Sequence, residues 1–366
     1  MPPLRGGREN LMIQRLQALL KETQCAAIFS PENRRYYTGM NTSNGLLAVS
    51  RDFAVFYTDF RYITAAKARL EPQIPVRMFE KSVSSALETF LGETGCQEVL
   101  YEEERLCAGK LSRLKRALPS VAFLPGEDLI FSPRAVKTEE EVSCIAKAQA
   151  IADRAFGEVC RYISSEKNNG LTEKQIALFL EFEMRKNGSG KMPFPVIVAS
   201  GENSACPHSE VSGRVIQPGD FITMDFGATW RDYCSDMTRT VAVDRATEKQ
   251  REVYDLVFRA QHKALDGIRA GICGNQADAL ARDVIVAAGY GKNFGHSLGH
   301  GVGIEIHEMP AFSPNYQAEI PCGTVISVEP GVYLAGEFGV RIEDLVVVRP
   351  DGVQNLANSP KELLIL

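Results

Sequence analysis

Several features that would quickly assign a protein to a class are missing from this sequence of 366 residues. Its net charge of −5 comes with no basic stripe, so nucleic-acid binding has little electrostatic support. The nine cysteines are an odd number without a CxxC pair, which argues against a disulfide framework and against a Cys₄ zinc site. No run of eighteen apolar residues occurs, so we expect no membrane span and no membrane partner.

Two further absences concern location and cofactors. The stretch MPPLRGGRENLMIQ has no apolar segment of the kind found in secretory signals, and with reduced thiols this predicts a cytoplasmic protein. No glycine-rich phosphate loop follows a strand-like run in the first third, so we expect no nucleotide site there. The length favours two domains, and 45% hydrophobic residues can form a sizeable core.

The first part of the chain alternates between helical and strand patterns. Helices are predicted over residues 8–23, 62–70, 82–92 and 104–117. Strands are predicted at 25–29, 45–50, 53–59, 75–79, 98–102 and 121–125. We interpret PENRRYYTGMNTSNG, residues 31–45, as a loop. The alternation predicts a smaller α/β domain with a mixed sheet over residues 1–132, ending near FSPRAVK.

The second part repeats one order of elements. Capping boxes at Thr138, Thr172 and Thr247, and Asn275 as a fourth start, open four helices that come in two pairs. Each pair precedes strands that carry carboxylates, including FITMDFGA and MTRTVAV as a hairpin. This predicts an internal duplication, and thus an α+β domain with pseudo-twofold symmetry over residues 133–366.

Four carboxylates lie in or beside these strand-like runs: Asp225, Asp236, Glu329 and Glu343. A hairpin turning near Trp230-Arg231 would place the two aspartates opposite each other on one face. Inward-facing charges are costly unless they are cancelled, and like charges this close raise a pKa sharply. Four carboxylates and one neutral imidazole match the charge of two divalent cations.

The same residues also have structural interpretations. The aspartates could pair with Arg231 or Arg239, and Glu343 could pair with Arg341. As ligands, carboxylates with one imidazole form a hard set that suits Mn²⁺, with Co²⁺ and Zn²⁺ as alternatives. Two bridged ions can share a water, lower its pKa and stabilise a tetrahedral intermediate.

Histidine is scarce, with five in the chain. His262 lies on a predicted helix and is assigned a structural role. The other four fall in glycine-rich or proline-flanked segments near the carboxylate motifs: His208, His296, His300 and His307. The glycines around His300 favour a strand or loop over a helical ligand pair. This distribution indicates a pocket beside the carboxylates.

Together, SGENSACPH, MDFGATWRDYCSDMTRT, GHGVGIEIHE, VEPGVY and VRIEDLV closely resemble the pita-bread metallopeptidase family. That family includes Xaa-Pro aminopeptidases, prolidases, methionine aminopeptidases and creatinases. The resemblance begins near residue 133 and implies helix pairs packed on a curved antiparallel sheet. PENRRYYTGM and YTDFRY resemble the creatinase/prolidase N-terminal domain.

The resemblance implies a role for each motif residue. Two metal ions would be bound by Asp225, Asp236, His300, Glu329 and Glu343. Glu329 would also act as proton shuttle, and His208 and His307 would line the pocket and stabilise the intermediate or the leaving nitrogen. His296 would contribute to the proline-side pocket, and Arg341 would orient the ligand carboxylates.

The expected function is an Xaa-Pro aminopeptidase acting on peptides with proline in second position. The extra N-terminal domain argues against a minimal methionine aminopeptidase. A prolidase and creatinase-like chemistry remain alternatives, whereas a non-catalytic binding protein is disfavoured because no ligand position is lost. Arg231-Asp232 occupies the place, at the tip of the hairpin, where relatives commonly have a glycine before Tyr233. This departure bears on substrate access more than on metal binding. Such families commonly form homodimers or larger homo-oligomers.

Overall fold

The computed structural model describes residues 8–366, with side chains from residue 12 onward, and the chain divides into two compact units, Met1–Arg134 and Ala135–Leu366. Residues 1–7, on which part of the cytoplasmic expectation rests, lie outside the described residues. The boundary predicted after residue 132 falls inside helix α6 (Glu127–Ala135), and the units separate two residues later.

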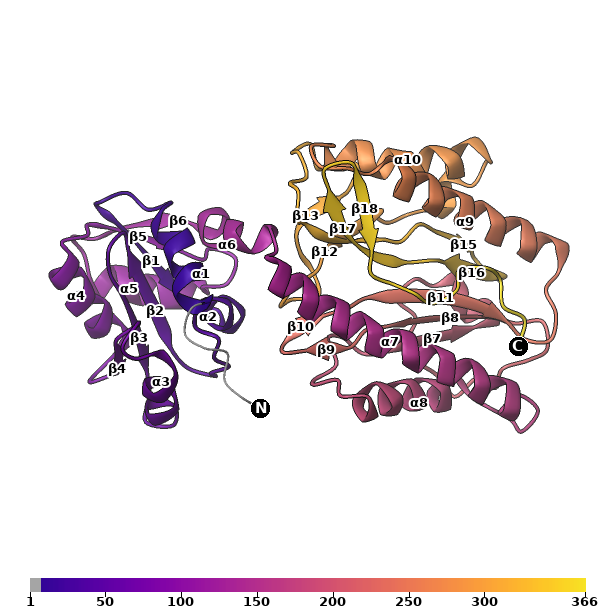
Figure 1. Cartoon of the computed structure of the whole chain (residues 1–366), viewed down its shortest axis with the longest axis horizontal. Helices are drawn as coiled ribbons and strands as arrows, with labels where there is room; N and C mark the ends of the chain where they lie inside the picture. The colour runs from indigo at the N-terminus through magenta and orange to yellow at the C-terminus, as the bar shows by residue number, and fades with distance from the viewer. Residues whose placement is uncertain (1–7) are drawn as a thin grey trace. The chain divides into compact units, whose positions relative to one another are not determined.

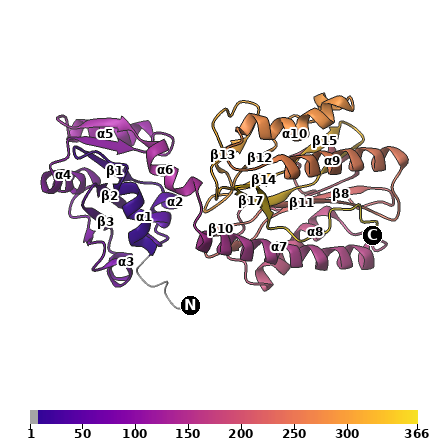
Figure 2. The ribbon, with the colours of Figure 1, turned by 45° about the horizontal axis from the view of Figure 1, so that its top comes forward.

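The first unit is a mixed six-stranded sheet with helices around it (Figures 1 and 2). Its strand order is β4-β3-β2-β1-β5-β6, with β1 antiparallel to β2 and parallel to β5. Its strands are β1 (Gln24–Ile28), β2 (Leu46–Ser50), β3 (Ala54–Thr58), β4 (Val76–Met78), β5 (Glu98–Tyr101) and β6 (Ala122–Pro125). Besides α6, its helices are α1 (Arg8–Gln17), α2 (Pro31–Thr38), α3 (Ile63–Leu70), α4 (Val83–Thr94) and α5 (Ala108–Ala117).

Helix α2 corrects the interpretation of residues 31–45 as a loop. Ser30 caps this helix by accepting a hydrogen bond from the Asn33 amide, and Pro31 occupies the first turn. Gly39 ends it in the left-handed conformation, with φ of 67°. Proline and glycine therefore mark the two ends of a helix within the segment interpreted as a loop.

The second unit contains two helix pairs, each followed by strands. The helices are α7 (Glu139–Glu166), α8 (Glu173–Lys186), α9 (Glu248–Gly267) and α10 (Gly274–Ala287). The strands of the first half are β7 (Ile197–Ser200), β8 (Phe221–Phe226), β9 (Thr229–Trp230), β10 (Tyr233–Cys234) and β11 (Met237–Ala242). Those of the second half are β12 (Gly299–Gly301), β13 (Glu308–Phe312), β14 (Val325–Val328), β15 (Gly331–Leu334), β16 (Phe338–Arg341), β17 (Asp344–Arg349) and β18 (Gly352–Asn355).

The strands of this unit lie between the helix pairs. Figures 1 and 2 both show α7 and α8 on one side and α9 and α10 on the other. The sheet β11-β8-β7 packs with α7 and α8 through one apolar core, and the sheet β13-β12-β14-β17-β18 packs with α9 and α10 through another. All pairings in both sheets are antiparallel. The predicted α+β architecture, with helix pairs on antiparallel strands after a smaller α/β domain, is confirmed.

The hairpin that carries the two aspartates differs from its prediction in register. Asp225 pairs with Thr238, so Asp236 lies two residues away from the position directly opposite. An offset of two keeps both residues on one face, as diagonal neighbours. The turn consists of Arg231 and Asp232, both with positive φ, at 52° and 68°. These are the signs that a two-residue type I′ turn requires, although neither residue is glycine.

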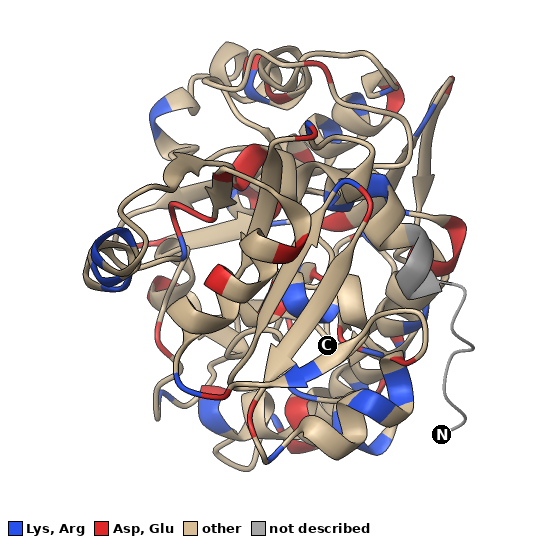
Figure 3. Cartoon of the chain, turned by 90° about the vertical axis from the view of Figure 1, so that its left-hand side faces the viewer, with Lys and Arg blue, Asp and Glu red and all other residues tan. Residues whose placement is uncertain are grey.

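Residues of both charge signs occur on the elements of the chain. In Figure 3, basic and acidic residues are interspersed over the elements that face the viewer. Within residues 8–366, no helix combines the length and the apolar character that crossing a bilayer requires.

Candidate active site

The five predicted metal ligands come from separate places in the second unit and line one cavity of about 910 Å³. They are Asp225 in β8, Asp236 just before β11, His300 in β12, Glu329 just after β14 and Glu343 between β16 and β17. Donor atoms of Asp236, His300 and Glu343 lie within 4.8 Å of one another. The His300 Nε2 is 3.5 Å from the Asp236 Oδ2 and 3.4 Å from the Glu329 Oε1.

Neighbouring groups orient these donors. The Thr238 hydroxyl donates to the Glu343 Oε2 at 2.7 Å, and the Ser327 hydroxyl donates to the Glu329 Oε1 at 3.1 Å. The His300 Nδ1 lies 3.2 Å from the Gly301 carbonyl, which can only accept, so this nitrogen carries the proton. The Nε2 of His300 is therefore left as an acceptor that faces the carboxylates, as a metal-binding imidazole requires.

The carboxylates repel one another in a buried place. Burial, followed by the charge of neighbouring carboxylates, raises the pKa of Asp236 and of Glu343 well above their ordinary values. Burial also raises the pKa of Glu329. The Oδ1 of Asp225 is buried and has no hydrogen-bond partner among the described residues. The site thus concentrates negative charge and leaves a buried oxygen unsatisfied, which fits divalent cations.

Two arginines near the site, Arg239 and Arg341, form ion pairs that differ from those considered in the structural interpretations of the sequence. Arg239 forms its ion pair with Asp344, at 2.8 Å, instead of with the hairpin aspartates. Arg341 pairs with Asp225 at 2.7 Å instead of with Glu343, two residues along its own chain. Asp225 is therefore bound to a cation of the protein through one oxygen and faces the cavity cluster with the other.

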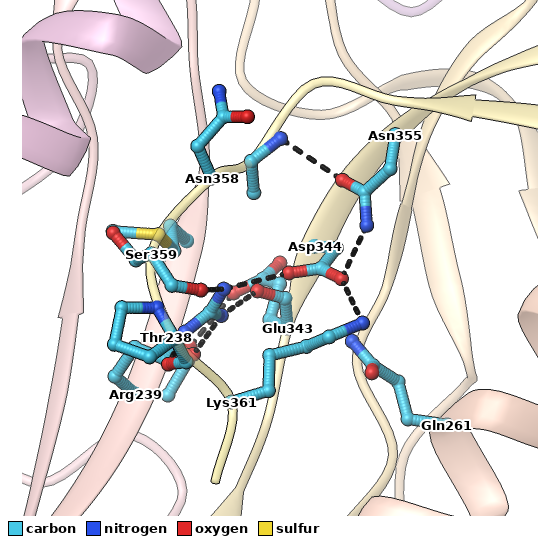
Figure 4. Close-up of polar contacts among 12 residues, drawn as sticks. Thr238, Arg239, Gln261, Glu343, Asp344, Asn355, Asn358, Ser359 and Lys361 are labelled. Carbon is cyan, nitrogen blue, oxygen red and sulfur yellow. Dashed lines mark hydrogen bonds and ion pairs between the residues drawn. The ribbon is translucent and has the colours of Figure 1, made fainter.

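A second polar cluster lies beside Glu343 and is shown in Figure 4. Arg239 donates to Asp344 and also to the backbone carbonyl of Glu343. Lys361 and Asn355 donate to the other oxygen of Asp344, at 2.8 Å and 2.6 Å. Burial raises the pKa of Asp344, but Arg239 and Lys361 outweigh it, and the net pKa is lowered. Arg239 thus holds the backbone of Glu343, and Arg239, Asp344 and Lys361 are not among the residues that line the cavity.

The predicted substrate residues all line the same cavity. The rings of His300 and His307 meet edge to face, with centroids 4.2 Å apart, and burial lowers the pKa of His307. His208 is exposed on the loop after β7. His262 lies apart in α9, where its ring contacts Phe258, in line with its structural assignment.

His296 and Arg341 are linked by Tyr333, which the sequence did not single out. Arg341 donates to the Tyr333 hydroxyl at 2.9 Å, and that hydroxyl lies 3.0 Å from the His296 Nε2. Because the His296 Nδ1 donates to the Ser297 carbonyl, the tyrosine must donate to the Nε2. Tyr333 belongs to the VEPGVY motif, so its position in that motif was the available signal.

The fold and the carboxylate–imidazole cluster define a metal-dependent hydrolase. Two family models match the chain: metallopeptidase family M24 over residues 143–350, and the creatinase/prolidase N-terminal domain over residues 12–136. The chain belongs to metallopeptidase family M24, whose members use divalent metal ions.

Known relatives are similar along nearly the whole chain. The Xaa-Pro dipeptidase of Pyrococcus furiosus is 36% identical over 359 residues, which are 96% of this chain and 100% of the relative. The structure of an Xaa-Pro dipeptidase from Bacillus anthracis aligns with a TM-score of 0.92 at 37% identity, covering 98% of this chain and 100% of that one. An X-Pro aminopeptidase from Thermotoga maritima aligns with a TM-score of 0.87 at 35% identity, covering 96% and 100%.

Proposed function

We propose that this protein is an Xaa-Pro aminopeptidase that uses two divalent ions to remove an N-terminal residue from peptides with proline in second position. The observation that carries the proposal is the cavity, which is lined by all five candidate ligands and also by apolar residues of α8 and of the segment before β7. Its volume, about 910 Å³, lies at the upper end of the range of roughly 300–1,000 Å³ for ligand pockets. A cavity of this volume does not exclude a substrate longer than a dipeptide.

The apolar wall suits a proline ring. Phe194, Pro195, Val196 and Ile197 line the cavity together with Leu178 of α8. Burying the ring there stabilises the complex by about 25 cal/mol for each Å² of apolar surface removed from water. The imide nitrogen of proline has no hydrogen to donate, so the site needs no acceptor for it.

The ligands proposed for the two ions are Asp225, Asp236, His300, Glu329 and Glu343. Bound there, the ions supply Lewis-acid chemistry, since they polarise a carbonyl and lower the pKa of a water. Glu329 is proposed to accept the proton of the attacking water and to deliver it to the departing nitrogen. His208 and His307 bind the substrate and stabilise the intermediate, and His296 contributes to the proline side of the pocket.

Arg341 has a supporting role in this proposal. Its guanidinium holds Asp225 through one oxygen and, through Tyr333, fixes the ring of His296. One buried cation thus orients both a ligand and a substrate residue. This supports the assignment of Arg341 to the orientation of the site.

An Xaa-Pro dipeptidase is the second candidate, because relatives of that name match the chain end to end. The test is turnover of matched Xaa-Pro dipeptides and Xaa-Pro-Yaa tripeptides by one metal-titrated preparation. The aminopeptidase proposal requires cleavage of the tripeptide. Cleavage of dipeptides alone would replace it with the dipeptidase, and inactivity on both with intact metal binding would favour creatinase-like chemistry.

Three finer points belong to the same proposal. Mn²⁺ is the expected ion because the donors are oxygens with a single imidazole, and metal-dependent turnover with Mn²⁺, Co²⁺ and Zn²⁺ tests this. A homodimer or larger homo-oligomer is expected, and sedimentation measures it. A cytoplasmic location is expected, and cell fractionation tests it.

A further inference from the structure

One buried carboxylate holds both ends of the loop that carries His208. Glu173, the first residue of α8, is fully buried. Its Oε1 accepts hydrogen bonds from the Ser200 amide at 2.7 Å and the Ser200 hydroxyl at 2.8 Å. Its Oε2 accepts from the Ser212 amide at 3.1 Å and the Ser212 hydroxyl at 2.6 Å. Asn203 adds a fifth hydrogen bond, at 3.0 Å.

The segment between these ends, residues 201–211, is hereafter the His208 loop. Its residues 207–211 form part of the cavity wall. The middle of the loop is attached to β16, since the Gly339 amide donates to the Ser204 hydroxyl at 2.9 Å and Arg341 donates to the Pro207 carbonyl at 3.3 Å. Glu173 is absent from the residues that line the cavity, so it does not contact the substrate itself, and its carboxylate is bonded to the two ends of this loop.

The strength of this arrangement comes from its charge. Hydrogen bonds to an ionised carboxylate are shorter and roughly twice as strong as those between neutral groups. Burial raises the pKa of Glu173, but the hydrogen bonds from Ser212, Ser200 and Asn203 outweigh it, and the net pKa is lowered. The carboxylate is therefore ionised where it holds the loop. Such a buried and fully bonded group has few alternative arrangements.

We propose that Glu173 is a positioning residue for substrate binding, and that its carboxylate joins Ser200 to Ser212 and so sets the cavity wall that carries His208. The proposal rests on the proposed peptidase function. The first measurement, hydrogen–deuterium exchange, does not depend on activity. The role of Glu173 and the peptidase function can therefore be refuted separately.

The main variant is Glu173→Gln. The amide group replaces one accepting oxygen with a donor that faces the Ser200 or Ser212 donors, so one end of the loop is released. Hydrogen–deuterium exchange of the metal-loaded full chain is expected to accelerate in peptides covering residues 200–212 and to remain unchanged in β8 and β14. On an Xaa-Pro-Yaa tripeptide, kcat/KM is expected to fall about tenfold, the equivalent of one released charged hydrogen bond.

Three further variants make the result specific. Glu202→Gln, the same change at an exposed residue of the same loop, is expected to behave like the wild type. Glu173→Asp keeps the charge and is expected to recover part of the loss. Ser212→Ala removes one hydroxyl donor but keeps the amide donor, so it provides a milder test if Glu173→Gln does not fold.

A double-mutant cycle connects the carboxylate to the histidine. If Glu173 acts through the His208 loop, Glu173→Gln costs less in a His208→Ala background than in the wild type. Full additivity, unchanged exchange in residues 200–212, or no recovery in Glu173→Asp would each overturn the proposal. A wild-type protein that cleaves no Xaa-Pro peptide would instead refute the proposed function, while the exchange data would still decide whether Glu173 holds the loop.

Discussion

Glu343 and Asp344 are neighbours in the chain, and both are buried, with 2% and 0% of their surface exposed. Their pKa values nevertheless move in opposite directions, raised for Glu343 and lowered for Asp344. Glu343 points to the other carboxylates of the cavity, whereas Asp344 points to Arg239 and Lys361 (Figure 4). Successive residues point to opposite sides of an extended chain, so adjacent acids enter different surroundings.

The comparison separates two uses of a buried charge. The cluster around Asp344 is neutralised by cations of the protein and holds the structure together. The cluster around Glu343 is left without enough protein cations, and this is the condition in which external divalent ions bind. The four predictions below test this distinction, from the largest expected effect to the smallest.

Glu329→Gln tests the cavity cluster through catalysis. It removes the proposed proton carrier and one ligand charge, so kcat is expected to fall about 10²- to 10⁴-fold. Tripeptide turnover at saturating metal measures this, and calorimetry of metal binding separates lost affinity from lost proton transfer. Turnover equal to wild type would refute the assignment of Glu329.

Neutralising the two neighbours should have opposite effects on the metal-free protein. Asp344→Asn leaves Arg239 and Lys361 without their buried partner, so the free energy of unfolding is expected to fall by about 3–5 kcal/mol. Glu343→Gln removes a charge that the surrounding carboxylates oppose, so the free energy of unfolding is expected to rise. Urea denaturation in the presence of a chelator measures both. Equal destabilisation by the two changes would contradict the distinction.

Adding Mn²⁺ is expected to reverse the effect of Glu343→Gln on the free energy of unfolding, from stabilising to destabilising. At a free Mn²⁺ concentration about a hundred times its dissociation constant, the wild type is expected to gain about 2.7 kcal/mol of stability for one ion. Glu343→Gln is expected to gain less, because one ligand charge is missing. Thermal unfolding with and without Mn²⁺ measures the gain. An equal gain in both proteins would show that Glu343 does not bind the ion.

Glu173 extends the comparison to a carboxylate held by neutral donors. Its folded pKa lies below its ordinary value of 4.5, so its contribution is fully present above that value and is lost as pH falls through the folded pKa. The stability difference between wild type and Glu173→Gln is therefore expected to stay constant from pH 7 to about 5 and to shrink at lower pH. Denaturation at a series of pH values checks this. A difference that grows on acidification would contradict the lowered pKa.

The elements with strong local signals were predicted well. The capping boxes at Thr138, Thr172 and Thr247 are all present, because a cap depends on residues three positions apart. The two strands predicted for the Asp225 hairpin, β8 and β11, also form as expected. Helix α2 was missed because its start and stop residues, Pro31 and Gly39, are also common in loops. The hairpin register was predicted two residues out because the turn chosen was Trp230-Arg231 in place of Arg231-Asp232.

Side-chain partners over long separations could not be predicted. Arg341 lies two residues from Glu343 but pairs with Asp225, 116 positions away, and Arg239 pairs with Asp344 over 105 positions. The hydrogen-bond partners of Tyr333 and Glu173 likewise come from distant parts of the chain or from other elements. The spacing of residues along the chain does not show which of several carboxylates an arginine contacts.

The sequence alone was enough to name the candidate donors and the family motifs, since ligand chemistry is a property of residue types in order along the chain. The tertiary structure decided which buried carboxylates are neutralised by arginine and lysine and which remain available to metal ions. The physical reason is that the energy of a buried charge depends on the charges and dipoles within a few ångströms of it, and folding brings those from distant parts of the chain.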